Sequence, residues 1–206
     1  MKKIFLVFLI AVLSLTSFSY FNLYEPKVLN NGQGSLGLGT NSIFRYGILN
    51  VMEVGLSPIP YVKIGMNAGD LWGSVGYAQF YESMLFLSVG KYNENSTFYL
   101  TGMYVEDAWV HDENKKQEIA VLPVIELKRE DPIGNIKLFG GYNYNLSDKT
   151  HRGFTAVQVG SYFDFNWWKF KDVYLYGGLG VNIPFKGLTD SIIILAGFDT
   201  YFNFFD

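Results

Sequence analysis

The sequence predicts an all-β protein, an antiparallel up-and-down transmembrane β-barrel of about 10–12 strands. Apolar and polar residues alternate with a period of two along most of the chain after Gly34, which is typical of strands whose two faces meet different surroundings. Most alternating stretches are close to the ~9–11 residues that cross a bilayer at a tilt. Only 17% of the 206 residues are charged, whereas 18% are aromatic.

The N-terminus has the features of a secretory signal peptide. Two lysines precede an uncharged apolar run at 4–15, which is shorter than the roughly 20 residues of a membrane-spanning helix. Small side chains follow, as signal peptidase requires. We therefore expect residues 1–19 to be a signal peptide cleaved near Ser19, and residues 20–206 to form one barrel domain.

Apolar and polar residues alternate in eleven stretches of the chain, with turn-forming residues between the stretches. Bacterial single-chain barrels usually have an even number of strands, so one strand is missed or wrongly divided, most plainly within 20–56. Twelve strands would use part of 20–31, and ten would merge 34–56. Two longer polar stretches, 106–117 and 145–152, are expected to be long loops. The predicted strands are 34–43, 46–56, 60–68, 71–80, 84–92, 97–106, 117–128, 136–144, 153–164, 173–183 and 190–204.

The two-residue alternation of apolar and polar side chains does not by itself show which face of each strand points inward. A soluble barrel or sandwich turns its apolar face inward, whereas a membrane barrel turns it outward to lipid. The polar faces here carry few Lys and Glu, which favours a lumen over a solvent-exposed sheet surface. Aromatic rings also gather near predicted strand ends, where the lipid headgroups would lie. We expect an aromatic girdle that includes Trp72, Trp167, Trp168 and Phe170.

The faces opposite the aliphatic ones carry the side chains expected inside the barrel. Both signs of charge occur there, since Lys63 and Lys137 are found with Asp199. This mixture predicts internal ion pairs as readily as a selective pore. The expected lumen-lining residues are Lys63, Lys137, Asn143, Tyr174, Tyr176, Asn182 and Asp199.

The chain ends on a long amphipathic strand that contains Phe198, Phe202 and Phe204. With the signal peptide and the barrel strands, residues 34–206 resemble the small, porin-like outer-membrane β-barrel proteins of bacteria, without a specific subfamily. The resemblance implies that these three Phe form the C-terminal assembly signal read by the barrel-assembly machinery, although Asp206 is the last residue. It also implies a location in the outer membrane, with lipid as the surrounding partner.

Composition and motifs favour no cofactor, metal or catalytic centre. The chain has no Cys, which excludes disulfides and thiolate chemistry, and its net charge of −3 argues against nucleic acid as a partner. The glycines at 32–37 fit G-x-G-x-x-G but lack the strand and helix of a nucleotide site. The acidic cluster around His111 is interpreted as a solvated loop. Neither His111 nor His151 lies in a nucleophile motif, so we expect the protein not to be an enzyme.

The expected role is a porin-like channel or a structural barrel that allows passive diffusion of small solutes. One alternative is a soluble periplasmic β-barrel whose aliphatic faces line a cavity for an apolar ligand. Another is an enzyme with its site at the barrel rim. The direction of the aliphatic faces separates the first two, and the surroundings of the histidines bear on the third.

Overall fold

The computed structural model describes residues 25–39, 43–57, 59–79, 82–107, 117–128, 134–167, 170–184 and 192–203. Several features expected from the sequence lie outside these residues: the signal peptide and its cleavage near Ser19, His111, Trp168 and Phe204. The side chains of Trp167, Phe170 and Asn182 are likewise outside the description.

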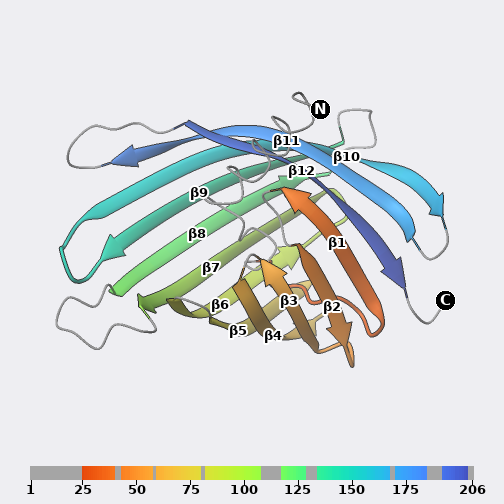
Figure 1. Ribbon diagram of the computed structural model, residues 1–206, viewed down its shortest axis with the longest axis horizontal. Helices are drawn as coiled ribbons and strands as arrows, with labels where there is room; N and C mark the ends of the chain where they lie inside the picture. The colour runs from red at the N-terminus through yellow and green to blue at the C-terminus, as the bar shows by residue number, and fades with distance from the viewer. Residues whose placement is uncertain are drawn as a thin grey trace, which may run out of the picture.

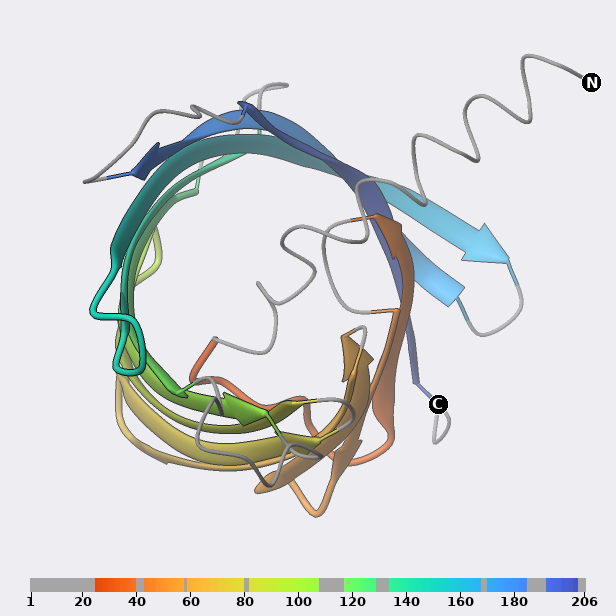
Figure 2. The same ribbon diagram turned by 60° about the vertical axis from the view of Figure 1, so that its left-hand side comes forward.

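The described strands form one closed antiparallel barrel (Figure 1; Figure 2). Each strand pairs with the next along the chain, and the last strand pairs back onto the first. The predicted all-β, up-and-down barrel is therefore confirmed, with twelve strands. They are β1 (Gln33–Gly39), β2 (Phe44–Ile48), β3 (Met52–Ser57), β4 (Ile59–Ala68), β5 (Leu71–Gln79), β6 (Glu82–Tyr92), β7 (Ser96–Asp107), β8 (Gln117–Leu127), β9 (Asn135–Asn145), β10 (His151–Trp167), β11 (Phe170–Pro184) and β12 (Ile192–Asn203).

The twelfth strand comes from a turn that the sequence conceals. The predicted strands 34–43 and 46–56 are in fact three short strands, because the chain reverses between β2 and β3. Leu49 and Asn50 have φ of 56° and 59°, the left-handed pair of a type I′ turn. A leucine rarely adopts this conformation, so the sequence gives little sign of the turn. The expectation that a twelfth strand would use part of 20–31 is wrong.

The twelve-strand topology places the long polar loops together. The barrel end that carries the tight turns at 49–51, 69–70 and 93–95, together with the start of β1 and the end of β12, is called the turn end below. The connections after β7 and β9, which correspond to the predicted loops 106–117 and 145–152, both lie at the opposite end, the loop end. Among the described residues, no helix is long and apolar enough to cross a membrane.

Large aliphatic side chains lie on the outside of the barrel. Leu179 is 63% exposed and Leu87 is 66% exposed, although both lie within paired strands. An outward apolar surface of this kind suits hydrocarbon and not water. The alternative in which the aliphatic faces line an internal cavity is therefore contradicted. Other exposed aliphatic residues include Ile64, Val75, Leu85, Val89, Leu100, Val121, Ile125, Leu138, Val157, Leu175, Val181 and Ile194.

The interior is divided into an apolar half and a polar half. The apolar cluster lies toward the loop end, where Ala78 is near the end of β5 and Met84 is near the start of β6. Its central ring, Phe86, lies against Gly76, where a β-carbon would be 2.0 Å from the ring. The polar lumen expected from the alternation is therefore interrupted by this apolar cluster. The cluster comprises Tyr61, Ala78, Met84, Phe86, Tyr99, Met103, Ala120, Leu122, Val124, Phe139, Ala156 and Leu195.

Candidate functional site

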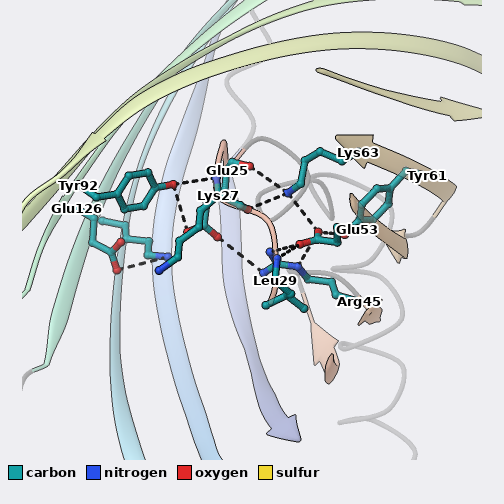
Figure 3. Close-up of polar contacts among 10 residues, drawn as sticks. Glu25, Lys27, Leu29, Arg45, Glu53, Tyr61, Lys63, Tyr92 and Glu126 are labelled. Carbon is teal, nitrogen blue, oxygen red and sulfur yellow. Dashed lines mark hydrogen bonds and ion pairs between the residues drawn. The ribbon is translucent and has the colours of Figure 1, made fainter. Parts of the chain in front are cut away.

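The segment from Glu25 to Asn31, which precedes β1, runs inside the barrel (Figure 2; Figure 3). It follows the inner wall closely because the facing wall positions are glycines. A β-carbon at Gly47 would lie 2.2 Å from the carbonyl oxygen of Asn30, and one at Gly65 would lie 2.8 Å from a methyl of Val28. Side chains at these two positions would therefore prevent the segment from docking.

A buried carboxylate, that of Glu53 on β3, holds this segment to the wall (Figure 3). Arg45 on β2 makes a bidentate contact with it, from Nε to Oε1 at 3.0 Å and from Nη2 to Oε2 at 2.9 Å. The Tyr61 hydroxyl donates to Oε1 at 2.7 Å, and the Lys63 ammonium lies 3.2 Å from the same oxygen. The amide of Leu29 in the lumenal segment donates to Oε2 at 3.0 Å.

Lys63 and Arg45 also connect the wall to the lumenal segment directly. The Lys63 ammonium donates to the carbonyl oxygens of Glu25 at 3.0 Å and Lys27 at 3.2 Å. The Arg45 Nη1 atom lies 3.8 Å from the Glu25 carboxylate. Buried charges persist only when paired and hydrogen-bonded, and here two cations share one central anion with a second anion nearby. The network therefore fixes the position of the segment in the lumen.

The N-terminal part of the lumenal segment packs against aromatic rings on β5 and β6. The Lys27 ammonium lies 5.9 Å from the centre of the Trp72 ring and 6.0 Å from that of Tyr92. The Lys27 amide donates to the Tyr92 hydroxyl at 3.2 Å, and that hydroxyl donates to the Glu25 carboxylate at 3.4 Å. Trp72 was expected in an outward girdle, but it shares the lumen-facing parity of Ser74 and lies inside.

A cavity of about 680 Å³ lies between this segment and the wall formed by β9–β12, toward the turn end. Its charged lining is mixed, with Lys27, Arg45, Lys128 and Lys137 as cations and Glu25, Glu126 and Asp199 as anions. The Lys137 ammonium lies 3.5 Å from the Glu126 carboxylate, which also accepts a hydrogen bond from the Asn135 amide at 3.0 Å. Four tyrosines complete the aromatic part of the lining: Tyr92, Tyr162, Tyr174 and Tyr201.

The structure places the expected lumen-lining residues at several levels of the barrel. Lys137, Tyr174 and Asp199 line the cavity, whereas Lys63 and Tyr176 are buried outside its lining. Asn143 lies near the loop end and donates to Glu118 at 2.6 Å. Lys63 and Lys137 do form internal ion pairs, and their carboxylate partners are Glu53 and Glu126.

The C-terminal aromatic residues differ in their surroundings. Phe198 is 37% exposed and faces outward, whereas Phe202 is buried. The Phe202 ring covers Gly34 on β1, where a β-carbon would lie 2.1 Å from it. Phe202 thus packs at the seam where the barrel closes.

Sequence reasoning missed the residues that organise the lumen, namely Glu25, Arg45, Glu53, Tyr92 and Glu126. Reading 46–56 as one strand puts Glu53 on the same face as Leu49 and Val51, which hides its lumenal position. Had the turn at Leu49 been recognised, β2 and β3 would each carry one inward charge of opposite sign. That pairing was the available signal.

The loop-end rim contains the one candidate histidine that the structure describes. The His151 Nδ1 atom shares a hydrogen bond with the Tyr142 hydroxyl, and its ring lies 4.7 Å from that of Tyr144. Asp148 is bonded to the hydroxyl and the amide of Thr150, and these bonds lower the pKa of its carboxyl group. Among the described residues, no three His, Asp or Glu side chains are grouped to hold a metal ion.

Among known proteins, this chain is similar only at low sequence identity to the solved structures described next. No family model matches the chain, and no curated protein matches it. A loop L8 deletion mutant of OmpT, an outer membrane protein of Vibrio cholerae, is 15% identical with a TM-score of 0.46 over 81% of this chain. The in-vitro folded, trimeric OmpT of the same organism is 14% identical, with a TM-score of 0.44 over 81% of this chain.

The chain spans 62% and 64% of the length of these two OmpT structures. Both are outer membrane proteins of Vibrio cholerae. The closed twelve-strand antiparallel barrel of this chain is the architecture expected from its resemblance to bacterial outer-membrane barrels. The expectation that the protein is not an enzyme is not supported by these matches. At 15% identity and a TM-score of 0.46, the OmpT match leaves enzyme status unestablished.

Proposed function

We propose that this protein is an outer-membrane barrel that passes small solutes by passive diffusion, in a porin-like role. The observation that carries the proposal is a cavity of about 680 Å³, lined by charges of both signs, inside a barrel whose outer surface is aliphatic. Lipid would surround such a surface, and hydrated solutes would be retained within such a lumen. The lumenal segment 25–31 would set the width of the passage at the turn end.

The apolar cluster toward the loop end would then be the narrowest part of the passage. Hydrophobic constrictions limit conduction because water leaves them readily. Phe86 and Leu122 are both buried in this cluster, so the proposed passage is narrow and its conductance small. The near balance of cations and anions around the cavity further predicts weak ion selectivity.

Single-channel recording in planar lipid bilayers tests the proposal. The purified, heat-modifiable protein should produce small, discrete current steps with a reversal potential near zero in a KCl gradient. Asn135→Trp should lower the conductance because this side chain lines the cavity, whereas Leu138→Trp, on the outer face of the same strand, should leave it unchanged. Equal effects of the two substitutions would contradict a path through the cavity.

A structural barrel is the second candidate, because the apolar cluster can fill the loop-end half of the interior with side chains. A folded, membrane-inserted protein that gives no current steps would establish this role in place of the channel. Cavity-lining and outer-face tryptophan variants would then be indistinguishable in every conductance measurement.

We also propose that the protein is located in the outer membrane. Export with cleavage near Ser19 is supported by the signal-peptide features of residues 1–19. Insertion by the barrel-assembly machinery and residence in the outer membrane are supported by the aliphatic exterior. Fractionation of expressing cells and mass spectrometry of the mature N-terminus test these steps separately. Recovery of a detergent-independent periplasmic protein would overturn insertion and residence in the outer membrane, and an uncleaved N-terminus would overturn processing near Ser19.

A further inference from the structure

Tyr162 presents an open aromatic ring to the lumenal cavity. It lies at a lumen-facing position of β10, and its neighbour Phe163 faces outward. Tyr162 lines the cavity and is 56% exposed, whereas Tyr174, directly opposite on β11, is 2% exposed. Tyr162 lies two residues beyond Gly160, the last residue of β10 that pairs with β9, so its ring lines the cavity at the turn end. Its free surface is available there to a solute that enters the cavity.

Other tyrosines hold the Tyr162 ring in place. Its centroid lies 4.6 Å from that of Tyr174 at an interplanar angle of 35°, and 6.3 Å from that of Tyr201. The Tyr174 ring in turn crosses Gly160, where a β-carbon would lie 2.3 Å from it. Tyr176 stacks on Tyr174 at 5.7 Å. A platform supported in this way loses little side-chain entropy when a ligand stacks on it.

Polar groups around the platform favour a neutral ligand over an ion. Lys137 and Glu126 are paired, and Asn135 donates to the same carboxylate, so an ionic ligand that binds to either of these two charged groups would have to displace an existing partner. Hydroxyl groups, in contrast, can donate to a carboxylate and accept from an ammonium or amide without changing the charge. The Thr97 hydroxyl, which is buried and lines the same cavity, has no hydrogen-bond partner within the described part of the chain.

We propose that the cavity binds a neutral, polyhydroxylated ring solute of mono- or disaccharide size. The apolar face of the solute would stack on Tyr162, while its hydroxyls would bond with Glu126, Lys137 and Thr97. The volume of about 680 Å³ lies within the ~300–1,000 Å³ common for small-molecule sites. The inference rests on the proposed channel for the route by which the solute arrives, but binding itself requires no conduction.

Calorimetric titration with maltose tests the site in lauryldimethylamine oxide, a detergent without a sugar headgroup. We expect saturable binding to the wild type and to Tyr162→Phe, which keeps the ring. Tyr162→Ala should weaken binding about tenfold or more, since stacking is lost. Tyr77→Ala removes an exposed tyrosine from the outer face of β5 and should bind like the wild type. Heat-modifiability on gels confirms that each variant is folded.

The outcomes separate this inference from the proposed function. Conduction without maltose binding would overturn the inference and leave the channel standing. Maltose binding without conduction would support the inference and refute the channel. Equal binding by Tyr162→Ala and the wild type would overturn the stacking site. Tighter binding of uridine, with the same dependence on Tyr162, would overturn the polyhydroxylated class in favour of a nucleobase.

Discussion

Replacing Glu53 by glutamine removes the negative charge that Arg45 and Lys63 share, without changing the volume of the side chain. In the native protein, Oε2 accepts from Arg45 and from the Leu29 amide, while Oε1 accepts from Arg45 and Tyr61 and contacts Lys63. A glutamine amide group at the Oε2 position would face two donors. At the Oε1 position it would face three, of which only the tyrosine hydroxyl can turn to accept.

At least two hydrogen bonds are lost in either orientation, and at least one of them is charge-assisted. Such bonds contribute roughly 1.5–3 kcal/mol each. Breaking a buried ion pair by removing one partner costs about 3–5 kcal/mol in total, because the cations stay buried. Glu53 is 0% exposed, so solvent screening does not reduce this cost. We therefore expect Glu53→Gln to lower the free energy of unfolding by about 3–5 kcal/mol.

Urea unfolding in lipid vesicles, followed by tryptophan fluorescence, measures this change, and Glu126→Gln is the matched control. Glu126 has one cationic partner, Lys137, at 3.5 Å, and both side chains retain some exposure. The control should therefore lose only about 1–2 kcal/mol. If Glu53→Gln lost no more than Glu126→Gln, the reasoning that the lumenal segment depends on a buried shared carboxylate would be refuted.

Two further substitutions test the outer and inner surfaces. Leu179→Arg should reduce the heat-modifiable, membrane-inserted fraction, because a cation at mid-membrane costs roughly 2–4 kcal/mol, whereas Leu146→Arg in a loop should insert normally. Gly47→Ala should expel the lumenal segment, lower stability by about 1–3 kcal/mol and speed proteolysis within 25–31. Gly102→Ala, where a β-carbon meets nothing within 4 Å, is the control, and equal proteolysis of both would contradict the docking.

The strand pattern was predictable because a period of two is a local property. From β4 onward each predicted strand corresponds to one observed strand, with ends that shift by a few residues. The site was harder to predict, because its residues come together by strand pairing. Glu53 meets Lys63 through the β3–β4 register, and Lys137 lies opposite Glu126 across β8 and β9. Neither pairing follows from the composition of a single strand.

The sequence by itself determined an all-β chain with aliphatic and polar faces on its strands, because side chains alternate across any strand whatever surrounds it. Tertiary structure decided that these strands number twelve, since the turn at Leu49 and Asn50 becomes clear only from the pairing of β2 with β3. It also decided that residues 25–31 lie inside the barrel. Only closure of the sheet creates the lumen in which Glu53, Arg45 and Lys63 can hold that segment.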